Sequence, residues 1–231
     1  MKNLIIIAHR GGKNGFKENS VEAFEHAIRE GCKVIEMDIR LNHLKKEFYL
    51  EHDFFHRPKM KKNLLSKVVD ALPQNIEYLV ELKTIALFRN CFARNFVEQF
   101  PRFFDYEKTL VQSFNPFVLI QLKKLDPKIR RAYLCGNPFW LFMFKLFLAA
   151  KILPESFHLH KRLLSRKNVA FGKSKKMNVI SFVLNSKKTW EKALSLGVDG
   201  IITDYPKALH DYVSSLSDTN SHGKTFKMAS N

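Results

Sequence analysis

The most constraining feature of this sequence is an alternation of short apolar runs with longer helical patterns, which continues almost from one end to the other. This alternation is typical of βα units packed around a parallel sheet. Eight of the short runs are predicted to be strands, at residues 4–8, 34–39, 78–83, 109–113, 130–134, 156–159, 177–183 and 200–203. Eight consecutive βα units predict an α/β fold of the closed (β/α)₈ TIM-barrel type.

Helical patterns follow most of the predicted strands. The clearest ones open with a capping Ser or with Pro in the first turn, at residues 20–30, 116–125 and 186–196. A further helix is predicted at 86–100, and the last helix is expected to end near Val213. Residues 214–231 are polar and without period, which predicts one domain over residues 1–213 and a disordered tail over 214–231.

The composition excludes several classes of protein. The 231 residues include 45% hydrophobic residues, which is typical of a globular domain with a sizeable core. Cys32, Cys91 and Cys135 lie far apart and in no zinc-binding spacing, so neither a disulfide framework nor a zinc site is predicted. The apolar run at the amino end is too short for a signal peptide, and a cytoplasmic location is therefore expected.

The formal net charge of +17 favours anionic partners such as phosphorylated substrates, anionic lipid surfaces or nucleic acid. Charge alone does not choose among them, and a solvated basic surface is the plainest interpretation. Because no DNA- or RNA-binding motif accompanies the charge, a nucleic-acid partner is not expected. The oligomeric state is not defined by the sequence.

Acidic residues lie inside two of the predicted strands. Glu36 and Asp38 are two residues apart, so they point to the same side of their strand. Glu81 and Lys83 likewise share one face of the next predicted parallel strand. Three carboxylates that converge on one point repel each other unless a cation lies between them, and a hard divalent ion, Mg²⁺ or Ca²⁺, prefers an all-oxygen shell. A single divalent cofactor is predicted.

Histidines and an arginine follow other strands. His9 and Arg10 come directly after the first strand, and His52 follows a short extended run at 47–51. In a barrel these residues would join the acids at the carboxyl ends of the strands, where barrel enzymes place their active sites. Acids for a metal, cations for a phosphate and histidines for proton transfer form a complete set for phosphodiester cleavage.

Each of these features taken alone has a plainer explanation. A Glu-x-Asp on a strand is more often a salt-bridge or partly exposed edge site, and histidine is not rare in this chain. Their joint order and spacing are specific, and they resemble the glycerophosphodiester phosphodiesterase family. The matching segments are His9-Arg-Gly-Gly, Glu18-Asn-Ser-Val-Glu-Ala-Phe, Ile35-Glu-Met-Asp, His52-Asp, Glu81-Leu-Lys, Gln112-Ser-Phe-Asn and Gly197-Val-Asp-Gly-Ile-Ile-Thr-Asp-Tyr-Pro.

The resemblance implies a role for each candidate residue: Glu36, Asp38 and Glu81 as metal ligands, His9 and His52 as general base and acid, and Arg10 and Lys83 as phosphate-binding residues. It also implies that a substrate hydroxyl beside the phosphate attacks first and that water then opens a cyclic phosphate. Asn19 is predicted to cap the helix that starts at Ser20 and to fix the loop near the site.

The chain departs from the family pattern in two places. The small helical insertion that many members carry after the His-Asp motif is reduced here to residues 54–76, which predicts a more open mouth. Phe182 stands where the family usually has Trp. Both departures concern the preference for the leaving alcohol rather than the metal chemistry.

Three functions fit these observations. The first is metal-dependent hydrolysis of a small glycerophosphodiester to glycerol 3-phosphate and an alcohol. The second is phospholipase D-like cleavage of a lysophospholipid or sphingolipid at a membrane surface. The third is an inactive basic binding module, against which the complete set of acids and histidines argues.

An apolar segment at residues 138–153 contains only Lys145 and Lys151 as charged residues. It is shorter than the roughly 20 residues that span a bilayer. Two interpretations remain open: a helix buried against the barrel, or peripheral contact with an anionic membrane through the stretch that begins at Phe139 and ends at Ala150.

Overall fold

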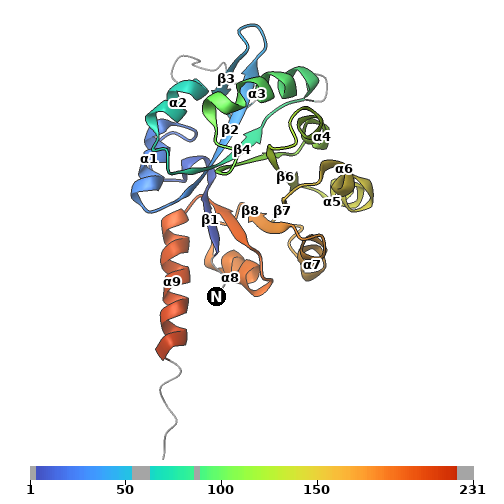
Figure 1. Ribbon diagram of the computed structural model, residues 1–231. Coiled ribbons are helices and arrows are strands. Elements are labelled where there is room, and N and C mark those ends of the chain that lie inside the picture. Colours follow the sequence, from blue (N-terminus) through green and yellow to red (C-terminus); the bar gives the residue numbers. More distant parts are fainter. Residues whose placement is uncertain (1–3, 54–62, 86–88, 223–231) are drawn as a thin grey trace, which may run out of the picture.

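The computed structural model describes residues 4–53, 63–85 and 89–222, and side chains only as far as residue 216. Within these residues eight parallel strands close into a barrel, and helices surround it (Figure 1). The sheet order is β1-β9-β8-β7-β6-β5-β4-β2, and pairing of β1 with β2 closes the ring. The predicted (β/α)₈ TIM barrel is therefore confirmed.

The strands of the barrel coincide with the predicted runs to within a few residues. They are β1 (Ile5–Ala8), β2 (Val34–Asn42), β4 (Glu77–Leu82), β5 (Thr109–Ser113), β6 (Arg130–Cys135), β7 (Ser156–His160), β8 (Asn178–Phe182) and β9 (Gly200–Thr203). A ninth strand, β3 (Glu47–Leu50), pairs antiparallel with β2 and forms a hairpin outside the ring.

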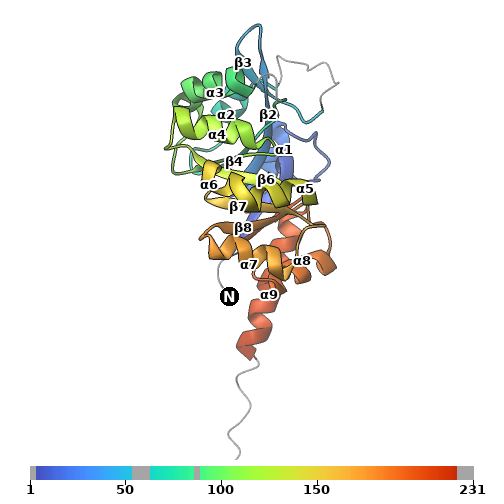
Figure 2. The same cartoon turned by 90° about the vertical axis from the view of Figure 1, so that its right-hand side faces the viewer.

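Helices cover the outside of the barrel (Figures 1 and 2). They are α1 (Val21–Arg29), α2 (Leu65–Ala71), α3 (Arg89–Phe103), α4 (Pro116–Leu125), α5 (Pro138–Met143), α6 (Ala149–Ile152), α7 (Arg166–Ser174), α8 (Lys187–Ser195) and α9 (Pro206–His222). A π-helical turn, η3 (Phe144–Leu148), joins α5 to α6, so the apolar segment forms one continuous helical rod. No helix in the described part of the chain has the length and apolar character that crossing a bilayer requires.

The core has two parts because side chains alternate along each strand. Residues that point outward, such as Ile35, Met37 and Ile39 of β2, are fully buried against the helices. Residues that point inward form a smaller apolar cluster inside the barrel, which includes Leu79 of β4 and Leu134 of β6. Glu36 pairs with Leu79 in register, so the acids of β2 point into the barrel.

The last helix and the segment after β3 differ in how far they follow the sequence-based expectations. The last helix does not end near Val213 but continues to His222, so the first half of the predicted tail is helical and that prediction was wrong there. The physical reason is that neither Gly nor Pro occurs between Pro206 and Gly223 to stop the helix. Of the reduced insertion at 54–76, residues 54–62 lie outside the described residues, and the rest contains the short helix α2.

Candidate active site

The chain turns sharply where β1 ends. The short helical turn η1 (His9–Gly11) follows directly, and Arg10 adopts a left-handed conformation with φ of 53°. This conformation aims the Arg10 backbone N–H at the Oε2 atom of Glu36, at 3.0 Å. Gly11 also has a positive φ, and a Cβ atom there would lie 2.7 Å from the Cβ of Ala23. Only glycine lets helix α1 pack this close to the turn.

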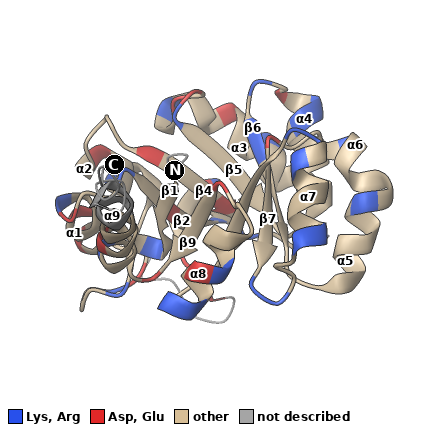
Figure 3. Ribbon diagram, turned by 90° about the horizontal axis from the view of Figure 1, so that it is seen from below, with Lys and Arg blue, Asp and Glu red and all other residues tan. Residues whose placement is uncertain are grey.

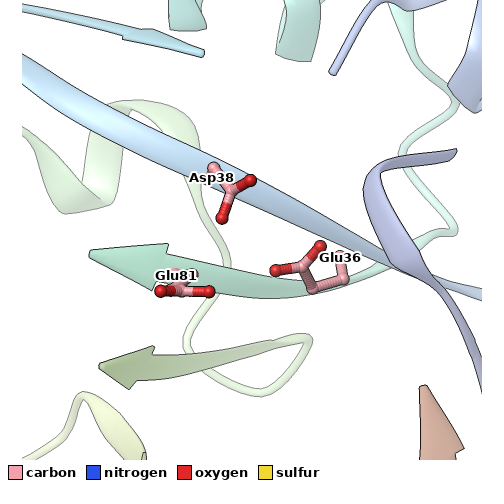
Figure 4. A group of neighbouring side chains, drawn as sticks. All are labelled: Glu36, Asp38 and Glu81. Carbon is pink, nitrogen blue, oxygen red and sulfur yellow. The ribbon is translucent and has the colours of Figure 1, made fainter. Parts of the chain in front are cut away.

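Three carboxylates converge inside the barrel mouth (Figure 4). Glu36 and Asp38 extend from β2 toward Glu81 on β4, and each offers an oxygen within 4.8 Å of the others. All three are buried, with exposed fractions of 1%, 0% and 6%. The strand register explains the convergence, because Asp38 lies directly opposite Glu81. The predicted grouping of these acids is what the structure shows.

Neutral amides hold two of these acids in place. Gln112 on β5 donates from Nε2 to Oε1 of Glu36 at 3.2 Å. The amide orientation of Gln112 is fixed in turn by His158, whose Nδ1 lies 2.8 Å from Gln112 Oε1. Burial lowers the pKa of His158 to about 3, so its ring is neutral. A neutral ring that donates from Nδ1 leaves the Gln112 amide hydrogens to face the acid.

Asn19 supports Asp38 in the same way. Its Nδ2 donates to Asp38 Oδ2, and its Oδ1 accepts from the Asp38 backbone N–H, both at 3.1 Å. The predicted capping role of Asn19 was wrong, because Ser20 caps helix α1 by accepting from the Ala23 N–H. The physical reason is that the amide of Asn19 satisfies a fully buried carboxylate, whereas the Ser20 hydroxyl is already placed for the cap.

Two cations stand beside the acids. Lys83 Nζ lies 2.6 Å from Glu81 Oε1 and 3.2 Å from Asp38 Oδ1. Arg10 Nε lies 2.8 Å from Asp38 Oδ2, at an angle that makes no hydrogen bond, while its Nη1 donates to Glu18 Oε2 at 2.7 Å. Both side chains also line the central pocket. They are placed where they face the acids on one side and a bound anion on the other.

The acids are not fully neutralised by these two cations. Burial raises the pKa of Glu81 to about 7, and the neighbouring charge of Asp38 adds to that effect. Burial, and then the charges of Asp38 and Glu81, raise the pKa of Glu36 well above its usual range. Burial also disfavours ionisation of Asp38, but Lys83 and Arg10 outweigh it and lower the pKa. Further positive charge is needed for all three to ionise.

A divalent cation fits this donor set. The three residues offer only carboxylate oxygens, which hard ions such as Mg²⁺ and Ca²⁺ prefer. Oδ1 of Asp38 is buried and makes no hydrogen bond, although Lys83 Nζ lies 3.2 Å away as an ionic partner. The raised pKa values of Glu36 and Glu81 mean that full ionisation of the cluster needs added positive charge, which marks it as a candidate metal centre.

Each candidate histidine is paired with a carboxylate through Nδ1. His9 Nδ1 lies 2.6 Å from Oδ1 of Asp204, which follows β9, and His52 Nδ1 lies 2.9 Å from Oδ1 of Asp53. Burial disfavours the ionised form of Asp204, but the hydrogen bond and charge of His9 outweigh it and lower the pKa of Asp204. Such pairing keeps the proton on Nδ1 and leaves Nε2 to exchange protons with a substrate.

One pocket of about 360 Å³ joins these groups. All seven predicted site residues are within it or in contact with its walls: His9, Arg10, Glu36, Asp38, His52, Glu81 and Lys83. Phe114 and Phe182 form an apolar wall with their ring centroids 5.7 Å apart, and His160 lies beside Phe182. The pocket is therefore ionic on one side and aromatic on the other.

Sequence reasoning missed several residues that the structure adds to the site. Asp204 and Gln112 belonged to recognised segments but had no predicted role, and His158 and His160 were not singled out. The positions of Gln112 and Asp204 relative to the strands could have identified them. Gln112 lies at a position in β5 whose side chain points into the barrel, and Asp204 directly follows the last strand, as His9 follows the first.

Fold and site together define a TIM-barrel enzyme with an acidic cluster and carboxylate-paired histidines in one pocket. A sequence profile described as the glycerophosphoryl diester phosphodiesterase family matches residues 9–43 and 42–208. The chain belongs to this family, and the predicted enzyme class, a phosphoric diester hydrolase, is confirmed.

Individual relatives agree with this assignment. A glycerophosphodiester phosphodiesterase of Bacillus altitudinis is 28% identical over 235 residues, which cover 87% of this chain and 94% of the relative. One from Caldanaerobacter subterraneus subsp. tengcongensis is 25% identical over 245 residues, covering 92% and 98%. An Oleispira antarctica phosphodiesterase, solved in complex with the product sn-glycerol-3-phosphate, shares the fold with a TM-score of 0.78 at 20% identity, covering 90% and 96%.

Proposed function

We propose that this protein hydrolyses glycerophosphodiesters to glycerol 3-phosphate and an alcohol, with one divalent cation as cofactor. The observation that supports it most is the convergence of three buried carboxylates and two carboxylate-paired histidines on one pocket. The product named for the Oleispira antarctica phosphodiesterase is the one expected here.

In this proposal Glu36, Asp38 and Glu81 hold the cation. When bound, the ion would supply positive charge that neutralises the phosphate and lowers the pKa of a nearby hydroxyl. Arg10 and Lys83 bind the phosphate oxygens, since both contact Asp38 and line the pocket together with Glu36 and Glu81. The fixed Gln112 and Asn19 amides keep the carboxylates oriented.

The histidines move the protons. His9 Nε2 takes the proton from the substrate hydroxyl beside the phosphate, and the oxygen of that hydroxyl attacks phosphorus. His52 gives a proton to the departing alcohol, so the bond to the alcohol breaks and a cyclic phosphodiester remains. In the second step water adds to phosphorus, with His52 now accepting a proton from water and His9 returning one to the ring oxygen that leaves. Glycerol 3-phosphate is released with both histidines restored.

Asp204 and Asp53 stabilise these exchanges by holding each imidazole through Nδ1. An imidazolium formed at His9 is further stabilised by the ionised Asp204, whose pKa is lowered. The aromatic wall of Phe114 and Phe182 then faces the non-reacting part of the substrate. Exclusion of water by this wall strengthens the ionic contacts on the opposite side.

The direct test offers glycerophosphocholine and glycerophosphoethanolamine to the purified protein with Mg²⁺ or Ca²⁺, and measures glycerol 3-phosphate and free alcohol. Glu36→Ala, Asp38→Ala and Glu81→Ala should each abolish metal-dependent turnover, as should a chelator on the wild type. Glu25→Ala, which removes a half-exposed acid outside the site, is the matched control. Near-normal rates in chelator or in all three site variants would disprove the metal assignment.

A lysophospholipid is the second candidate substrate, cleaved at the corresponding phosphodiester bond. The observation that favours it is Phe114, which lines the pocket and is 43% exposed, so it offers apolar surface to an acyl chain. Lysophosphatidylcholine should be included in the same assay, with lysophosphatidic acid and choline measured as products.

A further inference from the structure

The outer side of the rod formed by α5 and η3 is apolar and open to solvent. Phe139, Phe142, Leu146 and Phe147 are 62%, 60%, 57% and 46% exposed. The inner side packs on the barrel, since Phe144 is fully buried between Tyr133 and Phe157. The interpretation as a helix buried against the barrel holds for one face, and the other face is an exposed apolar strip, which we call the α5 surface. The membrane interpretation stays a prediction.

Aromatic side chains connect the α5 surface to the pocket. The Phe114 ring lies in the pocket wall with Lys83 Nζ 5.8 Å from its centroid, and it packs against Gly136, just before α5. Phe117, in the first turn of α4, contacts Trp140 with centroids 6.5 Å apart. Trp140 contacts Phe139 at 5.4 Å. Aromatic side chains therefore lie both in the pocket wall and along the neighbouring rod.

The chain around the α5 surface is strongly basic. Between Phe114 and Lys176 there are fourteen Lys and Arg but only two acids, Asp126 and Glu155. Both acids lie at the end of the barrel opposite the mouth, where Asp126 follows α4 and Glu155 precedes β7. Figure 3 shows blue segments on α4, α6 and α7 around the uncharged α5. Arg130 pairs with Glu155 and Lys173 with Asp199, so the helices on this flank present a clear excess of positive charge that a few acids offset only in part.

We propose that the α5 surface docks on an anionic phospholipid membrane. An apolar helical face flanked by cations is the arrangement that lies in a membrane interface, where the side chains enter the acyl boundary and the cations meet lipid phosphates. A second copy of the chain fits less well, because a symmetric contact would bring the two basic flanks together. Nucleic acid would meet the cations but leave the exposed Phe and Leu side chains without an apolar partner.

The docking has a consequence for the substrate, and this consequence rests on the proposed function. Because α5 begins where β6 ends, its first turn lies at the mouth of the barrel. A membrane against the α5 surface would hold the mouth near the headgroup layer, where the phosphodiester of a lysophospholipid lies. The aromatic side chains between Phe139 and Phe114 would then cover its acyl chain on the way to the pocket.

The test measures co-sedimentation of the full chain with vesicles of phosphatidylcholine alone and of phosphatidylcholine with one-third phosphatidylglycerol. Binding should require the anionic lipid and weaken at high salt. Phe139→Ser with Phe142→Ser should weaken binding by about tenfold or more, since two inserted aromatic side chains are lost. Leu44→Ser with Phe16→Ser, which removes exposed apolar side chains elsewhere, should leave binding unchanged. Trp140 and Phe144 are unsuitable targets because both pack on the core.

A second pair of variants tests the charge. Arg166→Gln with Lys167→Gln removes two exposed cations from the first turn of α7, beside the rod, and should weaken binding severalfold. Lys187→Gln with Lys188→Gln removes the same charge from the first turn of α8 and should have little effect. Equal loss in both pairs would show that net charge alone drives binding, which would overturn the proposed surface.

The other occupants are distinguishable. Absence of binding to anionic vesicles at low salt would reject the docking, and so would a stable dimer that the α5 variants dissociate. Tight binding of a duplex oligonucleotide, unaffected by Phe139→Ser with Phe142→Ser, would assign the basic flank to nucleic acid instead. Vesicle binding involves no turnover, so a protein that binds vesicles but cleaves no glycerophosphodiester would refute only the proposed function, and the reverse result only the docking.

Discussion

Binding of a divalent cation to the carboxylate cluster should release protons near neutral pH. The pKa of Glu81 is raised to about 7 and that of Glu36 stands well above its usual range, both chiefly because of burial. Below these pKa values the acids carry protons, and a cation must displace them to bind. We therefore predict that affinity for Mg²⁺ or Ca²⁺ rises with pH and levels off once both acids are ionised.

The magnitude follows from the number of protons displaced. Displacement of the Glu81 proton makes the dissociation constant about tenfold larger for each pH unit below about 7, and displacement of a second proton from Glu36 makes this dependence steeper. Cation at a hundred times its dissociation constant should stabilise the fold by about 2.7 kcal/mol. For a domain of this size, that corresponds to a rise in melting temperature of roughly 5–11 °C.

Isothermal titration calorimetry in two buffers with different ionisation enthalpies counts the protons directly, and thermal unfolding with cation or chelator checks the stabilisation. Glu81→Gln should weaken the affinity and reduce the number of protons released, whereas Glu25→Gln should change neither. A dissociation constant that stays the same from about one pH unit below neutrality to one above would refute the reasoning, because it would mean that the acids are ionised without the cation.

Three further outcomes can be checked with single substitutions. His9→Ala and His52→Ala should each lower turnover by on the order of 10²-fold or more without unfolding the barrel, and full activity in a folded variant would remove that histidine from the mechanism. Asp204→Asn should keep the fold but lower turnover by at least about 10²-fold, because the amide no longer fixes the His9 tautomer; an unchanged rate and pH profile would contradict this role. The pKa of His158 is about 3 in the folded chain and about 6.5 in the unfolded chain. At pH values between these two, the unfolded chain therefore binds a proton that the folded chain does not bind. Stability should therefore fall as pH decreases below about 6.5, by up to about 1.4 kcal/mol per pH unit, and urea unfolding of His158→Gln should show a shallower loss.

Much of the fold follows from the strand pattern alone. In β2 the alternation of Glu36 and Asp38 with Ile35, Met37 and Ile39 specifies which face enters the barrel, and the structure has the same parity. Residues 109–113 and 200–203 were predicted as strands to the residue. The ends of helices were harder to predict. The continuation of α9 to His222, for example, depends on the absence of helix breakers rather than on a hydrophobic pattern.

Contacts between side chains of distant strands were the part of the candidate site that was hardest to predict from the sequence. Gln112, His158 and Ser156 form a hydrogen-bonded chain across β5 and β7 that no local pattern encodes. Their side chains meet only because the barrel register brings alternate positions to one level. The exposed aromatic side chains of α5 were equally hidden, since a periodic sequence does not show which of two apolar faces is covered.

The pairing of His9 with Asp204 spans 195 positions and crosses the seam where β9 meets β1. The three carboxylates, in contrast, come from β2 and β4, which are both synthesised in the first half of the chain. His9 can therefore meet this carboxylate only after the last strand of the barrel has been synthesised. A chain truncated before β9 would keep all three acids of the cluster but lose the carboxylate partner of His9.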